Sequence, residues 1–165
     1  MVAVEIEAFE FSRLKERRDG EIPVAGLPRL AKECAATFGT LRWAVIGGMH
    51  ESGYPQLSMT VAGDVQLTCQ RCLQPYVHAI ESTATLVLAR SDLQADQIEA
   101  TLDDDSLDVI VVAPAMDLIE LIEDEALLSI PQAPKHDQCP ESEAASLENN
   151  AKKPSPFAAL KDLRH

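Results

Sequence analysis

The clearest pattern in the chain is a strict alternation of apolar and polar residues between positions 56 and 69. Six large apolar residues stand at odd-numbered positions: Leu57, Met59, Val61, Val65, Leu67 and Cys69. Side chains of a strand point alternately to its two faces. The alternation therefore predicts a long strand with one buried face and one solvated face, as in antiparallel sheets. A second strand is expected from about residue 76 to 90, so that the two form a long hairpin with a turn at its tip.

Two periodicities predict the shorter elements. Alternation over two residues indicates strands, and apolar residues four positions apart indicate helices. The further strands are expected at 2–11, 40–49 and 108–113, and the helices at 28–38 and 93–102.

One more helix is expected just after Pro114, with Asp117 in its first turn, where the helix dipole favours an acid, and with Pro131 ending it. Its apolar stripe consists of Leu118, Ile119, Ile122 and Ala126. Three acidic residues of this helix are expected to face outward and to bind a partner: Glu120, Glu123 and Asp124.

These elements predict an α+β protein. Its sheet is expected to be mostly antiparallel and strongly curved, or partly closed into a barrel, with two or three helices and a flexible C-terminal tail. A length of 165 residues is that of one domain. We assign this domain to residues 1–134 and the tail to residues 135–165. From residue 132 onward the chain is rich in Pro, Ser, Glu, Asn and Lys, a composition that does not form a packed core.

The charge of the chain is strongly negative and unevenly distributed. The formal net charge is -13. Residues 91–134 contain 12 of the 27 acidic residues and no Lys or Arg, so the other 15 acids nearly balance the 14 basic residues of the remaining chain. We call residues 91–134 the acidic segment. It is either a solvated face or a surface for a basic protein partner.

A small group of basic residues near the N-terminus leaves local RNA contact open, although the overall charge argues against a broad RNA-binding surface. The group comprises Arg13, Lys15, Arg17 and Arg18, and Arg71 is a further candidate for RNA contact.

A cytoplasmic location is expected from the sequence. No apolar run approaches the length that spans a bilayer. The first residues carry acids where a signal peptide would carry bases. Because cytoplasmic thiols stay reduced, a C-x-x-C pair there indicates metal or redox chemistry rather than a structural disulfide.

Two ligand pairs stand far apart in the chain, Cys69-Gln-Arg-Cys72 and His136-Asp-Gln-Cys139. Together they supply three sulfur donors and one imidazole, the number of ligands in a closed tetrahedral zinc site. Three alternatives remain open: Cys69 packs in the sheet core, the site lacks one ligand, or the pair is a thiol oxidoreductase motif. The last is disfavoured because such motifs place the first cysteine at a helix N-terminus.

The sequence offers no arrangement typical of an enzyme. The acidic runs at 103–105 and 123–125 do not converge on one substrate atom, and the chain has no Gly-rich phosphate loop. His50 and His78 stand without a nucleophile at a recognisable spacing. We therefore expect a protein that is not an enzyme.

The end of the tail carries an apolar run after a charged stretch, which is typical of a short docking motif. Phe157 and Leu160 are spaced to share one face of a helix. We define the docking motif by four residues: Pro154, Pro156, Phe157 and Leu160.

In combination these segments resemble the bacterial YceD family, which is named for accumulation of the large ribosomal RNA subunit. The resemblance extends from the C-x-x-C turn to the C-terminus. It rests on Cys69-Gln-Arg-Cys72, Pro75-Tyr76, Leu121-Ile-Glu-Asp-Glu125, Leu128-Ser-Ile-Pro131, His136, Cys139 and Lys153-Pro-Ser-Pro-Phe-Ala-Ala-Leu160. It implies a non-enzymatic ribosome biogenesis factor that supports accumulation or processing of 23S ribosomal RNA.

Two mechanisms are compatible with that role. In the first, a zinc-stabilised adaptor binds ribosomal proteins or rRNA-processing enzymes through the acidic segment and the docking motif. In the second, the protein contacts rRNA directly through its basic residues. The charge distribution favours the first. A thiol oxidoreductase remains a third possibility, and it predicts a reversible Cys69–Cys72 disulfide without bound metal.

Overall fold

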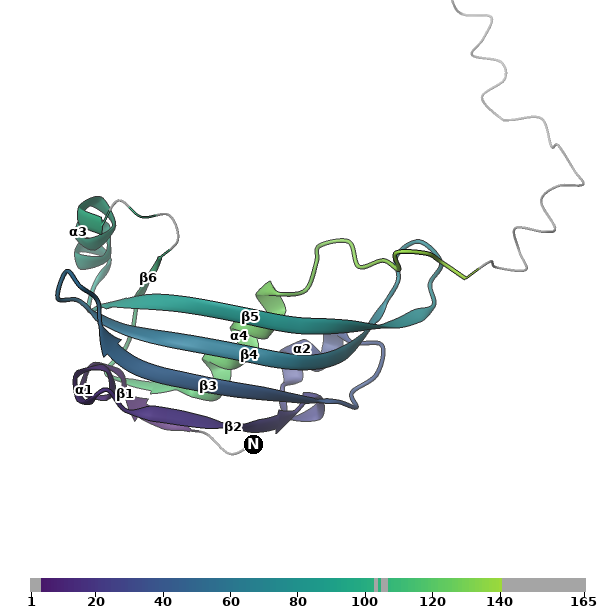
Figure 1. Cartoon of the computed structure of the whole chain (residues 1–165), viewed down its shortest axis with the longest axis horizontal. Helices are drawn as coiled ribbons and strands as arrows, with labels where there is room; N and C mark the ends of the chain where they lie inside the picture. Colours follow the sequence, from purple (N-terminus) through teal and green to yellow (C-terminus); the bar gives the residue numbers. More distant parts are fainter. Residues whose placement is uncertain (1–3, 103, 105–106, 141–165) are drawn as a thin grey trace, which may run out of the picture.

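A computed structural model describes residues 4–102, 104 and 107–140 of the chain. Its main element is a five-stranded sheet with the strand order β2-β3-β4-β5-β6 (Figure 1). The neighbouring strands are antiparallel except β5 and β6, which are parallel. The sheet is open, so the expected curved antiparallel sheet is found and closure into a barrel is not. The strands span Arg17–Pro23 (β2), Thr40–Met49 (β3), Pro55–Thr68 (β4), Pro75–Ala89 (β5) and Asp108–Val111 (β6).

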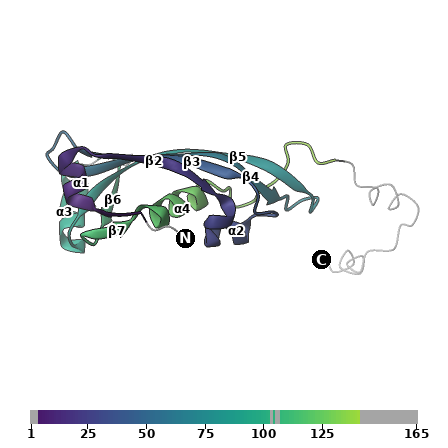
Figure 2. The ribbon, with the colours of Figure 1, turned by 90° about the horizontal axis from the view of Figure 1, so that it is seen from below.

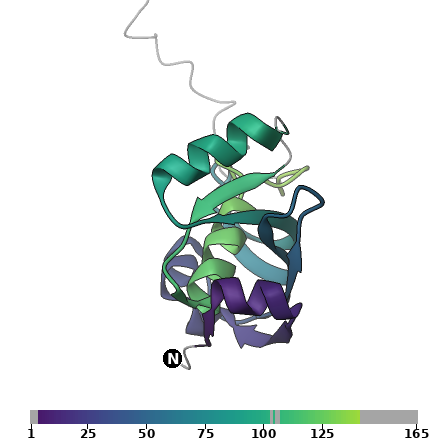
Figure 3. The same ribbon diagram turned by 90° about the vertical axis from the view of Figure 1, so that its left-hand side faces the viewer.

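Four α-helices, rather than two or three, accompany the sheet in the described part of the chain. A two-stranded sheet formed by β1 and β7 lies beside them. Helices α2 and α4 lie on the same side of the large sheet (Figure 2), and α3 packs against the end of β5 beside β6 (Figure 3). The bounds are Ala8–Leu14 (α1), Pro28–Glu33 (α2), Asp92–Leu102 (α3), Leu118–Leu128 (α4), Glu5–Glu7 (β1) and Ala115–Asp117 (β7), with a 3-10 turn at Val24–Gly26.

The long hairpin predicted from the alternation is confirmed as β4 and β5. The two strands pair without interruption from Gln56↔Val87 to Thr68↔Pro75. Leu57, Val61 and Leu67 are at most 1% exposed, as the alternation requires of the buried face. On its other edge β5 pairs with β6 only over Leu86–Ala89. The hairpin therefore extends far beyond β6 and carries the residues 69–74, which we call the hairpin tip.

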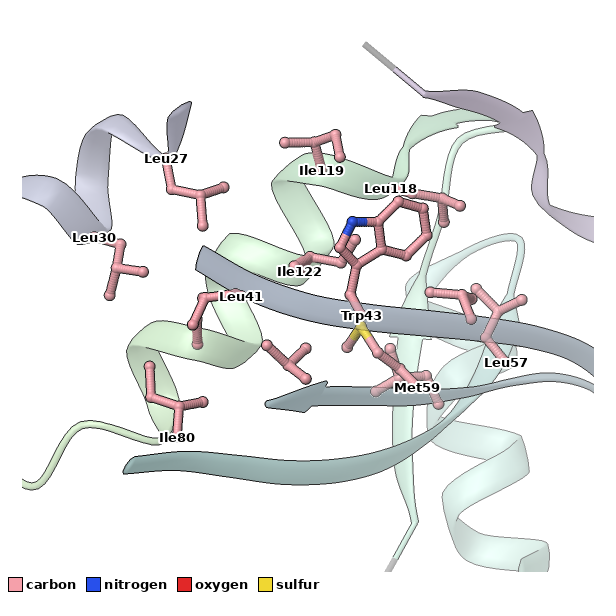
Figure 4. Packing of buried hydrophobic residues seen from close by; sticks show 14 of the residues in the cluster. Leu27, Leu30, Leu41, Trp43, Leu57, Met59, Ile80, Leu118, Ile119 and Ile122 are labelled. Carbon is pink, nitrogen blue, oxygen red and sulfur yellow. The ribbon is translucent and has the colours of Figure 1, made fainter. Parts of the chain in front are cut away.

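Helix α4 packs its apolar stripe against the buried face of the sheet (Figure 4). Leu118, Ile122 and Ala126 are fully buried. The helix begins one residue after Asp117, whose Oδ1 accepts the N–H of Ile119 at 2.9 Å. Asp117 is thus the N-cap rather than a residue of the first turn, because the short strand β7 separates the helix from Pro114. Each buried Leu or Ile of this stripe stabilises the fold by about 1.5–3 kcal/mol.

The prediction that Glu123 faces solvent is wrong. The residue is only 4% exposed, and its carboxylate lies at the N-terminus of α2. There it accepts the backbone N–H groups of Arg29 at 2.6 Å and Leu30 at 3.1 Å, and the Arg29 Nε–H at 2.8 Å. The Arg29 guanidinium also bonds Asp124 and the carbonyl of Glu120. Since Glu123 satisfies the first N–H groups of a helix, it fixes α2 on α4.

Two element boundaries also differ from the sequence expectation. The strand expected over 2–11 ends at Glu7, because the Glu7 carboxylate accepts the N–H of Glu10 and caps the start of α1. Helix α2 ends at Glu33, five residues before the expected end, and the Ala35 N–H then bonds the Gln66 carbonyl at 2.7 Å. Pairing with β4 therefore replaces the last predicted turn of the helix.

Replacing Glu123 by alanine is expected to destabilise the protein by about 2 kcal/mol, because three N–H donors lose their acceptor. The free energy of unfolding measured in urea checks this value. Glu120→Ala is the matched control, since the Glu120 side chain is exposed on the same helix and a surface change costs at most about 0.5 kcal/mol. Equal stabilities of the two variants would contradict the assigned role of Glu123.

Candidate metal centre

The first two sulfur donors are placed by the turn at the hairpin tip. Beyond the last strand pair, Thr68↔Pro75, the Cys69 N–H bonds the Gln74 carbonyl at 3.0 Å. The Leu73 N–H bonds the Cys69 carbonyl at 2.9 Å, and Leu73 itself has a left-handed backbone with φ 61°. The turn folds back tightly enough to bring both cysteine side chains to one place. Cys69 is fully buried there, and Cys72 is half-buried.

The other two donors reach the tip through the segment that follows α4 (Figure 1). The Gln70 N–H donates to the Pro134 carbonyl at 2.8 Å, which holds this segment beside the tip. The His136 ring then packs on the Tyr76 ring, with centroids 5.0 Å apart and planes at 45°. Backbone and ring contacts therefore orient His136 independently of any metal.

The four expected ligands form one cluster, which we call the metal cluster: Cys69, Cys72, His136 and Cys139. All four donor atoms lie within 4.8 Å of one another. The Sγ atoms of Cys69 and Cys139 are 3.7 Å apart, and Cys72 Sγ is 3.3 Å from His136 Nδ1. In a tetrahedral zinc site, two sulfurs are separated by about 3.8 Å and a sulfur and a nitrogen by about 3.6 Å.

The donor set also fits zinc chemically. Three thiolates and an imidazole are the ligands that zinc takes in closed structural sites. Because the protein fills all four positions, a bound ion would supply structural bonds and no open coordination site. Its effect would be to join the hairpin tip to the segment after α4.

The surroundings of Cys69 favour its thiolate form. Burial raises its pKa, but hydrogen bonds from the backbone of Cys72, His136 and Arg71 and from the His136 side chain lower it more, to about 5. The Arg71 N–H, for example, lies 3.4 Å from Cys69 Sγ. A thiolate at neutral pH is the state that metal binding requires. The pKa of Cys72 moves the other way: the Gln74 N–H lowers it, while burial and the neighbouring thiols raise it more.

Arg71 is exposed, but its side chain is bound to the metal cluster. Its Nε–H donates to Cys139 Sγ at 2.9 Å and its Nη2–H to the His136 carbonyl at 3.3 Å. The hydrogen bond to Cys139 is the main cause of the raised pKa of this guanidinium. The sequence suggested Arg71 as an RNA contact and missed these bonds. In the sequence, only its position within the C-x-x-C turn indicated that Arg71 could contact the cluster.

The other basic candidates are largely paired with acidic neighbours. Arg13 bonds Glu10 at 3.1 Å, Arg17 bonds Asp19 at 2.8 Å, and Arg18 bonds Glu16 at 2.9 Å. Lys15 is exposed at the C-terminal end of α1. These pairs reduce the positive field that a phosphate would meet.

The partner-binding candidates have separate outcomes. Glu120 and Asp124 are exposed on α4, and Asp124 bonds Arg29, whereas Glu123 is buried. The docking motif, Pro154, Pro156, Phe157 and Leu160, lies outside the described residues. So does most of the predicted tail, whose described part, 135–140, runs along the hairpin tip.

Taken together, the fold and the cluster define an α+β protein with four potential metal ligands between a hairpin tip and the segment that follows its last described helix. Residues 57–164 match the family model described as "Large ribosomal RNA subunit accumulation protein YceD", and this match covers more than half of the chain. The chain therefore belongs to the YceD family. The match includes all four residues of the metal cluster and none of the elements before β4.

One curated relative comes from Haemophilus influenzae and is named "Large ribosomal RNA subunit accumulation protein YceD". It is 33% identical over 108 residues, which are 61% of this chain and 60% of the relative. The match thus spans about three fifths of the relative's length. No solved structure matches the chain. None of the helices in the described residues is long and apolar enough to cross a membrane.

Protein purified without chelators is expected to contain one zinc per chain, because three sulfurs and one imidazole nitrogen lie within 4.8 Å of one another. Elemental analysis checks this. Cys72→Ser is expected to lose the zinc, whereas Cys34→Ser is the matched control, since Cys34 packs at the end of α2 away from the cluster. A stably folded wild-type protein without metal would refute the prediction.

Proposed function

We propose that this protein supports accumulation of the large-subunit (23S) ribosomal RNA as a non-enzymatic, zinc-stabilised adaptor. In this role it binds ribosomal proteins or rRNA-processing enzymes on the large-subunit precursor. The observation that carries the proposal is membership of the YceD family, together with the name of the Haemophilus relative. We place the role in the cytoplasm, where bacteria assemble ribosomes.

The closed donor set supports a structural rather than a catalytic metal. All four donors come from the protein, so a bound zinc has no position left for water or substrate. The thiol oxidoreductase alternative is weakened by the local fold. The Cys69–Cys72 turn connects two strands and does not begin a helix, whereas redox pairs use a helix N-terminus to activate their first cysteine.

The charge of the described surface supports a protein partner. Helix α3 exposes Asp92, Asp96 and Glu99, and its described residues include no Lys or Arg. A basic ribosomal protein would meet a complementary field there, and such complementarity speeds association and excludes acidic partners. The docking motif in the tail offers a second contact of apolar character.

Direct rRNA contact is the second candidate, because exposed arginines are present on α1 and β2. Against it, Arg13, Arg17 and Arg18 share their charge with nearby acids, and Arg71 is engaged with Cys139. Phosphate affinity depends on Lys and Arg side chains that neutralise phosphates and so release the counterions of the nucleic acid. We therefore rank protein binding above RNA binding.

In cells that lack this protein, the ratio of large-subunit to small-subunit ribosomal RNA is expected to fall. Quantification of both RNAs in total cellular RNA measures the ratio. Wild-type protein and Cys34→Ser should restore it, and Cys72→Ser should not, because the hairpin tip then loses its metal. An unchanged ratio in cells lacking the protein would overturn the proposed role, and full restoration by Cys72→Ser would show that the metal centre is dispensable.

A titration with fragments of large-subunit rRNA at several salt concentrations separates the two mechanisms. The adaptor mechanism predicts weak binding with a shallow salt dependence that Arg17→Ala and Arg18→Ala leave unchanged. Tight binding whose steep salt slope is lost in these two variants would instead establish direct contact, since each phosphate contact contributes about 0.9 to the slope on duplex nucleic acid and about 0.7 on single strands.

A further inference from the structure

We propose that Arg71 is a positioning residue of the metal centre, which compensates its charge and links its two ligand pairs. The proposal rests on the proposed function, in which Cys69, Cys72, His136 and Cys139 bind zinc. It replaces the RNA-contact role that the sequence suggested for Arg71.

The first argument is the position of Arg71 in the turn. It stands between the two cysteines of the first pair, and its backbone N–H lies 3.4 Å from Cys69 Sγ. Its side chain turns to the second pair, with Nε 2.9 Å from Cys139 Sγ and Nη2 3.3 Å from the His136 carbonyl. One residue therefore contacts both pairs, which are more than 60 positions apart in the sequence.

The second argument is charge. Three thiolates, one neutral imidazole and Zn²⁺ carry a net charge of -1, by the charges of the groups. Arginine remains protonated at any working pH, so its guanidinium brings the total to zero. The charged residues on either side of His136, Lys135 and Asp137, cancel one another. Arg71 is thus the cation that balances the cluster among the residues described around it.

The third argument is geometry. The guanidinium donates through two different nitrogens, one to a metal-ligand sulfur and one to the backbone of another ligand residue. A planar fork fits this pair of acceptors, whereas the ammonium of lysine is a point charge and cannot reproduce it. Outer hydrogen bonds of this kind orient the ligands and adjust how strongly they donate to the metal.

The same contacts make a prediction about sulfur reactivity. A hydrogen bond from a cation withdraws electron density from Cys139 Sγ and shields it from electrophiles. Without Arg71, the zinc-bound Cys139 thiolate is expected to be more nucleophilic than it is in the wild-type protein. A purely structural residue would change stability without changing the reactivity of one particular thiolate.

The test uses the purified full chain in four forms: wild type, Arg71→Ala, Arg71→Lys and Arg13→Ala. Arg13 is an exposed arginine on α1, paired with Glu10 and far from the cluster, and serves as the control. Zinc affinity is measured by competition with a chromophoric chelator. Alkylation of Cys139 by iodoacetamide is followed by peptide mass spectrometry at saturating zinc.

Arg71→Ala is expected to weaken zinc binding about 10–100-fold, the usual effect of removing an outer partner of a metal ligand. Arg71→Lys is expected to fall between Arg71→Ala and wild type, because it keeps the charge and loses the fork. Arg13→Ala should match wild type. Alkylation of Cys139 should be faster in Arg71→Ala than in wild type.

Wild-type affinity and alkylation rate in Arg71→Ala would overturn the role of Arg71 and leave the zinc site standing. Failure of the zinc site itself gives a different result, namely no zinc bound by the wild-type protein. Since Arg71 is exposed, its replacement leaves the hydrophobic core intact. Arg71→Lys provides a second, milder variant in which the same order of affinities must hold.

Discussion

The packing of α4 against the single apolar face of the sheet determines where the rest of the molecule can lie. Leu118, Ile122 and Ala126 have no exposed surface, so the helix cannot slide along the sheet without losing several kcal/mol of burial. Its end is fixed too, because the Ser129 carbonyl lies 3.4 Å from His78 Nε2 on β5. Two strand residues further towards the turn, Tyr76 receives the ring of His136. The position of the second ligand pair thus follows from the burial of a helix.

This packing also lowers the entropy cost of assembling the metal cluster. Cys72 and His136 are 64 positions apart, and closing a flexible loop of that length costs roughly 4 kcal/mol in chain entropy, apart from a constant term. Once α4 has packed, only the chain from Ser129 to His136 remains to be closed, at about 2 kcal/mol. The Gln70–Pro134 backbone bond removes part of that remainder. The cluster is therefore mostly preorganised by the fold, and a bound metal would need to stabilise only the last turn of chain.

Local patterns of the sequence predicted the elements and the ligands, but not the contacts between distant residues. Alternation gave the β4–β5 hairpin because side-chain direction in a strand depends only on position. The four candidate ligands were recognisable because a C-x-x-C and an H-x-x-C pair in turns have few other uses. Helical periodicity, in contrast, assigned Glu123 to the solvated side, and its true partners in α2 lie more than 90 positions away. The hydrogen bond of Arg71 could not be predicted for the same reason, since its acceptor Cys139 belongs to the other ligand pair.

The structure separates the metal cluster from the acidic helix α3. The hairpin tip lies at one end of the long axis and α3 at the other (Figure 1). A cluster that fills its own four coordination positions and neutralises its charge with Arg71 has little left with which to recognise a partner. Its effect is positional: Cys139 is held at the tip, so the chain that carries the docking motif leaves the described structure there. The proposed adaptor would then have its acidic helix at one end of the described structure and the start of its tail at the other, so that two partners could bind without contact between them.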